Sequence, residues 1–146
     1  METLPFWLKV GKKESITWQG FHTARYRFQG FLRLANNGLL LEWSGTTKIE
    51  DVGFLGIKSR THALPHEQLE LPLEQLRGIE LRGGWLRPRV ELSTAFEALS
   101  IVPSEELGRV RLWIHLADRA LAGRVVREVR RLVESVGLAR SQHTDA

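Results

Sequence analysis

The sequence predicts a mainly β (α+β) fold, in which a bent sheet or barrel of seven antiparallel strands is capped by one C-terminal amphipathic helix. Apolar and polar residues alternate in short runs between residues 24 and 116, and this alternation is typical of half-buried strands. The connections between the runs are mostly too short for a crossover helix, which favours antiparallel pairing. The last segment carries apolar residues at helical spacing, so the sheet and the helix each have an apolar face to bury.

The strand pattern recurs along most of the chain. The predicted strands span residues 24–34, 38–44, 68–73, 76–82, 85–93, 96–102 and 109–116. The first two are joined by Asn36-Asn37-Gly38, because an Asn-Gly pair favours a tight hairpin turn. Residues 44–66 are interpreted as a long excursion between strands, and long ordered loops often carry function.

The predicted helix begins at Ala117 or Asp118 and ends at Gly137, a residue type common just after the last helical turn. Its apolar residues form one stripe, which we expect to cover the open end of the sheet. The stripe consists of Leu121, Val125, Val129, Leu132, Val133 and Val136.

Length and composition indicate one globular domain. The chain has 146 residues, of which 42% are hydrophobic and 26% charged, and it has no cysteine. This balance excludes a disordered or fibrous chain, and the lack of cysteine excludes disulfides and thiol chemistry. We expect residues 1–20 to be a weakly structured lead-in that includes at most short strands, residues 21–137 to be the domain, and residues 138–146 to be a flexible tail.

The order of the elements over residues 24–136 resembles the pleckstrin-homology-like fold, particularly its bacterial single-domain versions. The likeness rests on the seven strands, the Asn36-Asn37-Gly38 hairpin, the last strand and the helix that follows it directly. The run from Ile114 to Ala122 resembles the strand-to-helix junction of such proteins. The resemblance implies a non-catalytic scaffold that binds lipids, peptides or other proteins. Phosphoinositide-binding members carry basic residues around the first hairpin loop, which is uncharged here, so no ligand residues are carried over.

The charge balance is mildly basic and rests on arginine. Lys and Arg number 21 against 17 Asp and Glu, for a net charge of +4. Arginine with interleaved tryptophan suits acidic peptides, single-stranded nucleic acid, lipid headgroups or a subunit interface; a solvated sheet face is an equally good interpretation. The predicted contact surface comprises Arg82, Trp85, Arg87, Arg89, Arg109, Arg111 and Trp113.

The sequence predicts no catalytic, cofactor-binding or metal-binding residues, and therefore no enzyme. His62 and His66 have the i,i+4 spacing of metal ligands on a helix, but Pro65 argues against a helix there. The remaining enzyme alternative is a metal hydrolase that uses these histidines and nearby glutamates. Gly53 and Gly56 match the GXXG loop of a nucleic-acid-binding domain, although flanking helices are not evident.

These observations together predict a cytoplasmic, non-catalytic binding module for a protein, a peptide or an anionic headgroup. The alternatives are a structural homo-oligomer and a nucleic-acid-binding protein that uses the Arg/Trp surface. The cytoplasmic assignment follows from the N-terminal residues, which lack the basic and apolar regions of a signal peptide. No stretch approaches the roughly 20 apolar residues that span a bilayer, so membrane contact is expected to be peripheral at most.

Overall fold

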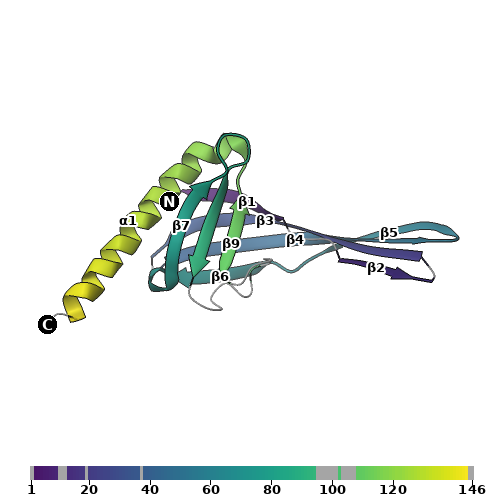
Figure 1. Cartoon of the computed structure of the whole chain (residues 1–146), viewed down its shortest axis with the longest axis horizontal. Helices are drawn as coiled ribbons and strands as arrows, with labels where there is room; N and C mark the ends of the chain where they lie inside the picture. The colour runs from purple at the N-terminus through teal and green to yellow at the C-terminus, as the bar shows by residue number, and fades with distance from the viewer. Residues whose placement is uncertain are drawn as a thin grey trace.

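The computed structural model describes residues 2–9, 13–18, 20–36, 38–94, 102 and 108–144. It is mainly antiparallel sheet followed by one C-terminal helix (Figure 1), which confirms the predicted fold class in this coarser form. The strands are β1 (Thr3–Lys9), β2 (Lys13–Thr17), β3 (Gly20–Ala35), β4 (Gly38–Gly53), β5 (Gly56–Ala63), β6 (Glu67–Pro72), β7 (Leu76–Arg82), β8 (Arg89–Thr94) and β9 (Arg109–Trp113). The helical elements are the 3-10 turns η1 (Leu73–Gln75) and η2 (Leu116–Asp118) and the helix α1 (Arg119–Thr144).

The sheet is open and contains nine strands in the described residues, where the sequence predicted seven. Its order is β5-β4-β3-β1-β9-β8-β7, with β2 paired to β3 and β6 paired to β4. The two longest strands, β3 and β4, have 16 residues each and pair from Gly20–Gly53 to Ala35–Gly38. This register confirms the hairpin predicted at Asn36, since only two residues separate the paired ends.

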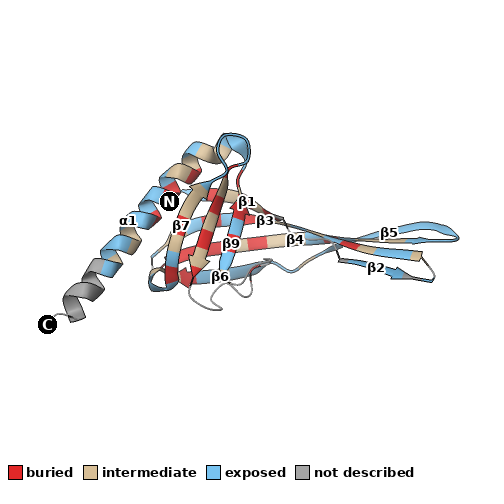
Figure 2. Cartoon of the chain, viewed as in Figure 1, coloured by how far each residue is buried: buried red, intermediate tan, exposed pale blue. Residues whose placement is uncertain are grey.

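The sheet divides into a body and a projecting arm (Figure 1). The hairpin ends of β3 and β4 lie in the body, where β1 and β6 flank them. Their other ends extend away between β2 and β5. We define the arm as residues 13–18, 20–27 and 46–63. Most of its residues are exposed, whereas the buried residues concentrate in the body (Figure 2).

The N-terminal segment contains a short strand at residues 3–9, as the sequence allowed, but this strand is a buried part of the body and not part of a weakly structured lead-in. β1 pairs with β3 along its whole length and meets β9 at Trp7–Trp113. Leu4, Phe6 and Leu8 are buried at 0%, 2% and 4% exposure. Three apolar residues at alternate positions supply enough buried surface to hold a short strand between two others.

The helix covers the body as predicted, because α1 packs mainly against β7 and η1. Val125 and Val129 of the predicted stripe are buried, and Leu121 and Val133 pack against the core partly buried. The predicted stop at Gly137 is wrong, since α1 continues to Thr144, through residues 138–144 of the expected tail. A glycine inside a helix costs only about 1 kcal/mol relative to alanine, and the next residues, Leu138, Ala139 and Arg140, are strong helix formers.

The expected excursion at residues 44–66 consists largely of strand. β4 continues to Gly53, a two-residue turn at Phe54 and Leu55 follows, and β5 returns along β4. Gly53 and Gly56 therefore flank a hairpin turn between two strands, which contradicts a GXXG loop between helices. Gly56 adopts φ +122°, a conformation that side-chain-bearing residues rarely take.

Two of the strands predicted in the C-terminal half are shorter than expected, and a third falls mostly outside the described residues. Residues 83–88 form a turn and bend, so β8 begins at Arg89, because Gly83 has positive φ and Pro88 lacks a backbone donor. The last strand ends at Trp113 instead of residue 116. The strand predicted at 96–102 lies outside the described residues except for Val102, which is buried.

Candidate functional site

The predicted Arg/Trp surface lies on the outer face of β7, β8 and β9. Arg82, Arg89 and Trp113 are neighbours across the three strands, and Arg111 lies in the next row on the same face. Arg109 is two residues before Arg111 on β9 and shares its face. Trp85 and Arg87 lie in the turn between β7 and β8. The structure thus brings five of the seven predicted residues onto one face and places the other two at its end.

The charge of this face is partly balanced by a glutamate that the sequence analysis left out. Glu91 of β8 lies 2.9 Å from Arg89, 3.3 Å from Arg82 and 3.6 Å from Arg111. Burial raises the pKa of the Glu91 carboxyl, but the hydrogen bond from Arg89 and the three positive charges outweigh it and lower the pKa. The signal was available in the alternation of β8, which places Glu91 on the same face as Arg89.

Arg82 is engaged in the same way by a second acid. Its Nε donates a hydrogen bond to Glu80 at 2.7 Å. That bond, together with the charges of Glu80 and Glu91, raises the pKa of the Arg82 guanidinium. The Arg/Trp surface is therefore a network of alternating charges, which presents less positive potential to a ligand than its arginines alone indicate.

The turn between β7 and β8 forms an apolar projection beside the start of α1. Trp85, Leu86 and Leu116 are exposed by 80%, 87% and 55%. The Arg119 guanidinium lies 5.3 Å from the centre of the Trp85 ring, within the range of a cation–π contact. Trp85, Leu116 and Arg119 border one groove of about 770 Å³ along α1. We call Trp85, Leu86 and Leu116 the turn patch.

The tip of the arm is the largest group of exposed apolar side chains among the described residues. Two turns meet there, one with Trp18 at 87% exposure and the other with Phe54 and Leu55 at 98% and 105%. Behind the turns, one row crosses all four strands, because its members are successive register partners. The row consists of Ile16 (76%), Phe21 (56%), Val52 (39%) and Ile57 (71%). We call these seven residues the arm tip.

Sequence analysis missed the arm tip because its residues are spread over four strands. Each strand contributes one apolar residue to the row. Within a single strand, that residue looks like part of the ordinary alternation of apolar and polar side chains. The available signal was Phe54-Leu55 between two glycines, since large apolar residues are unusual in a tight turn. Because residues 44–66 were expected to be an excursion and not strands, the pairing of β5 with β4, which brings Ile57 beside Val52, was not predicted.

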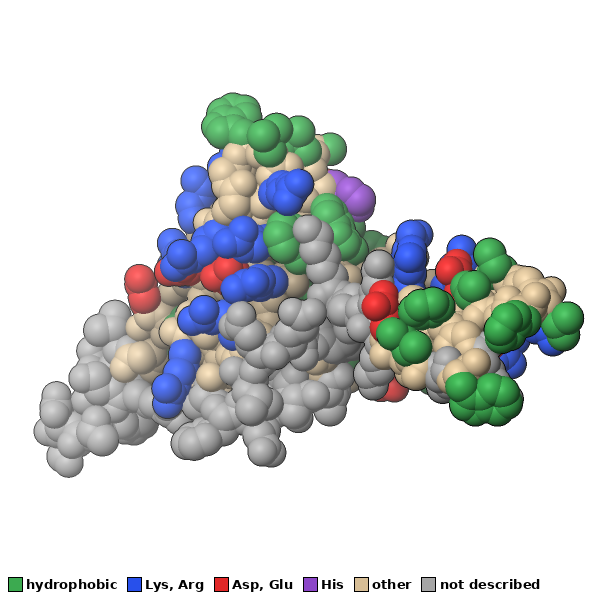
Figure 3. All heavy atoms as spheres, turned by 45° about the vertical axis from the view of Figure 1, so that its right-hand side comes forward, with side chains coloured by type: hydrophobic (Ala, Val, Ile, Leu, Met, Phe, Trp, Pro, Cys, Tyr) green, Lys and Arg blue, Asp and Glu red, His purple; other side chains and the backbone are tan. Residues whose placement is uncertain are grey.

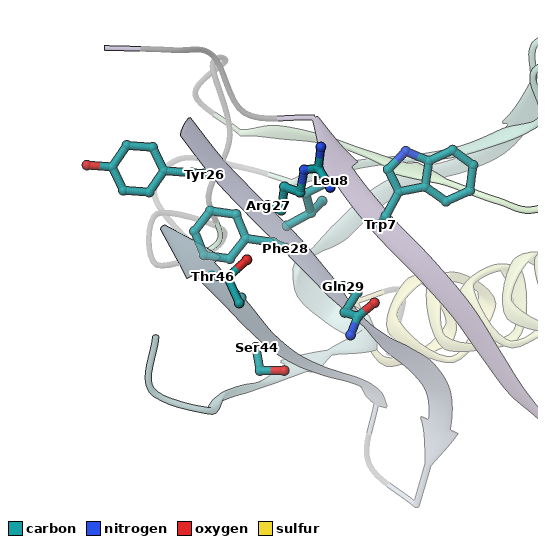
Figure 4. A pocket seen from close by; sticks show the side chains of 9 residues that line it. Trp7, Leu8, Tyr26, Arg27, Phe28, Gln29, Ser44 and Thr46 are labelled. Carbon is teal, nitrogen blue, oxygen red and sulfur yellow. The ribbon is translucent and has the colours of Figure 1, made fainter. Parts of the chain in front are cut away.

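A pocket of about 700 Å³ lies where the arm joins the body (Figure 4). β1 contributes Trp7 and Leu8, β3 contributes Tyr26 to Gln29, and β4 contributes Ser44 to Thr46. Arg27 is the one charged residue among those that line it. The lining includes three hydroxyls, from Tyr26, Ser44 and Thr46, and one amide, from Gln29, but no carboxylate or histidine, the side chains that most often act as a general base.

The two histidines of the metal-hydrolase alternative, His62 and His66, have different neighbours in the structure. His62 lies on β5 opposite Thr47, and the His66 Nε2 lies 4.0 Å from a Glu42 carboxylate oxygen. Within the described part of the chain, no three His, Asp or Glu residues are grouped so as to hold a metal ion. Two ligands alone leave a zinc site incomplete.

Among the described residues, no helix has the length and apolar character needed to cross a membrane. Comparison of the chain with known proteins does not assign a family. No family model, curated protein or solved structure matches it.

Proposed function

We propose that this protein is a non-catalytic interaction module that holds its partner through the arm tip. One observation carries the proposal: seven large apolar side chains project together from the end of a β-arm. Contiguous exposed apolar groups are uncommon on soluble monomers and mark interaction sites. The arm presents them at its end turns and in the strand row just behind those turns, away from the body (Figure 1).

The proposal includes a pleckstrin-homology-like fold for the body, with a bent sheet that approaches a barrel. The support is the order of the elements, an antiparallel sheet followed within a few residues by an amphipathic helix. Val125, Val126 and Val129 of that helix are buried against the sheet, as a helix that closes the end of such a sheet requires.

A nucleic-acid partner is less well supported than a partner with an apolar surface. The arginines that suggested it share one face with Glu91 and Glu80. Phosphate recognition depends on a surplus of positive charge, and these two carboxylates reduce the surplus.

The test follows the protein in extracts of its source cells. The wild type, the double variant Phe54→Ser/Leu55→Ser and the control Ser59→Ala/Thr61→Ala are compared by size-exclusion chromatography and by sedimentation of the extract. The control changes two exposed polar residues on the same arm. We expect the wild type and the control to migrate with a partner and the tip variant to migrate as a free monomer.

Folding is checked in each purified variant by circular dichroism and thermal unfolding. A wild-type protein that is already a free monomer, or a folded tip variant that migrates with the wild type, would refute the proposed function.

A further inference from the structure

Nearly all exposed large apolar residues of the described chain gather at two places, the end of the arm and the turn beside the start of α1. Eleven large hydrophobic residues are exposed. Seven form the arm tip and three form the turn patch. The remaining one, Phe31, lies between them on the outer face of β3 and β4, the face opposite the core, since its register partners are Pro5 and Glu42.

The outer face connects the arm tip to the turn patch without interruption. From the tip it runs along the outward residues of β3 to Gln29, beside Trp7 of β1. The Trp7 ring lies 4.6 Å from the His115 ring, and His115 precedes Leu116 of the turn patch. Figure 3 shows hydrophobic side chains on the outline of the molecule at the top and at the right-hand end, where Figure 1 places the turn between β7 and β8 and the end of the arm.

Basic residues lie behind each apolar end. On the arm, Arg25 and Lys48 are partners in the row that follows Phe21 by four positions, about 13 Å along the strand. Glu14 and Glu50 lie in the row between them on the same face, and Lys48 pairs with Glu50 at 3.2 Å. At the turn patch, Arg87 and Arg119 flank the exposed tryptophan. Apolar groups at the ends with cations behind them match the order of layers in an anionic bilayer surface.

The shape of the two ends favours a fluid surface over a folded partner. Phe54 and Leu55 stand on a convex turn with almost their whole side chains exposed, so a protein partner must supply a matching pocket, whereas a bilayer interface accommodates a convex apolar group without one. Tryptophan, present at both ends as Trp18 and Trp85, is the residue most typical of membrane–water interfaces.

A second copy of the chain fits the arm less well. One exposed edge of the arm is β5, which carries Lys58, Arg60 and His62, and the other is β2, which carries Lys13 and Glu14. Edge lysines and arginines oppose the addition of another strand, and two β5 edges in antiparallel contact would bring like charges together.

We infer that the outer face is tilted toward an anionic lipid bilayer, which the arm tip and the turn patch enter at two separate points. This inference rests on the proposed function, since it names the partner of the arm tip. Two points of entry fix the orientation of the body on the membrane, and Arg25, Lys48, Arg87 and Arg119 lie at the level of the lipid headgroups.

The test measures co-sedimentation of the purified full chain with vesicles of phosphatidylcholine alone or with phosphatidylglycerol added. The variants are Phe54→Ser/Leu55→Ser at the arm tip, Trp85→Ser/Leu86→Ser at the turn patch, their combination, and the control Ser15→Ala/His62→Ala, which changes two exposed residues on the opposite face of the arm. We expect binding to the anionic vesicles that weakens as salt increases. Each patch variant should lose about tenfold in affinity, and the combination should lose binding altogether, while the control binds as the wild type.

Several outcomes would overturn the inference. They are the absence of wild-type binding to anionic vesicles, equal binding by the combined variant, and a turn-patch variant that binds as tightly as the wild type. If the purified chain ignores vesicles but its partner in extracts still depends on Phe54 and Leu55, the bilayer is excluded and the proposed function stands. A concentration-dependent dimer that these two substitutions abolish would replace the bilayer with a second copy.

Discussion

The guanidinium of Arg119 lies 5.3 Å from the centre of the Trp85 ring, so the first residue of α1 contacts the turn between β7 and β8. The two residues are 34 positions apart in the chain (119 minus 85), and their contact joins the helix that covers the body to the turn that projects from it. Because both side chains border the same groove, this contact orients the turn patch relative to the rest of the sheet.

Removing either partner should loosen the turn. We expect Trp85→Ala and Arg119→Ala to show a coupling energy of about 0.5–1 kcal/mol in a double-mutant cycle, the range for an exposed cation–π pair. The measurement is urea unfolding of the wild type, both single variants and the double variant. Additive effects of the two substitutions would show that the contact contributes nothing to stability.

Glu91 should stabilise the fold at neutral pH and lose that effect in acid. Its carboxyl has a pKa below its ordinary value of 4.5 in the folded chain, so the unfolded chain binds the proton more readily. The stabilisation is therefore complete above the unfolded pKa and disappears as the pH falls through the folded one. Glu91→Gln should cost about 1–2 kcal/mol at pH near 7, for a partly buried acid with charged partners.

The check is urea unfolding of the wild type and of Glu91→Gln at a series of pH values from neutral down into the acidic range in which the Glu91 carboxyl gains its proton. The difference in unfolding free energy between the two proteins should shrink toward low pH. A constant difference would indicate that Glu91 acts through packing and not through its charge.

β1 should be indispensable to the body. Leu4 is fully buried, and truncating a buried leucine to alanine typically costs about 2–5 kcal/mol. We expect Leu4→Ala to lower the unfolding free energy by that amount, as measured by chemical denaturation. Thr3→Ala, a change at the exposed neighbouring position, serves as control. Equal stability of the two variants would return residues 3–9 to the role of a lead-in.

Gly137→Ala should stabilise the protein by about 0.5–1 kcal/mol, since alanine is the better helix former. Gly137 lies within α1, and an added Cβ meets nothing within 4 Å. A destabilised variant in thermal unfolding would instead place a left-handed residue there and restore the helix end predicted from the sequence.

Local patterns were sufficient to predict the sheet's main strands and the helix. The predicted boundaries of β7 match the structure at residues 76–82, and Val125 and Val129 are buried as their spacing indicated. The errors occur where a neighbour far along the chain decides the outcome. Residues 3–9 become a central strand only because β3 and β9 lie on either side of them.

The candidate site was predictable only in part for the same reason. Arg89 and Arg111 share a face, as the alternation of each strand suggested, but the balancing role of Glu91 depends on the register between β8 and β9. The arm tip depends on three registers at once, in which Phe21 meets both Ile16 and Val52. A pattern within one strand contains no information about such a row.

The length of the paired strands has a mechanical consequence. The eight residues of β5 run beside β4 and so carry the arm over about 26 Å. A stiff rod of that length, rocked by about 10° at its base, sweeps its free end through roughly 4–5 Å. The uninterrupted β3–β4 pair thus acts as a lever, and a small rotation in the body is amplified into a displacement at the far end.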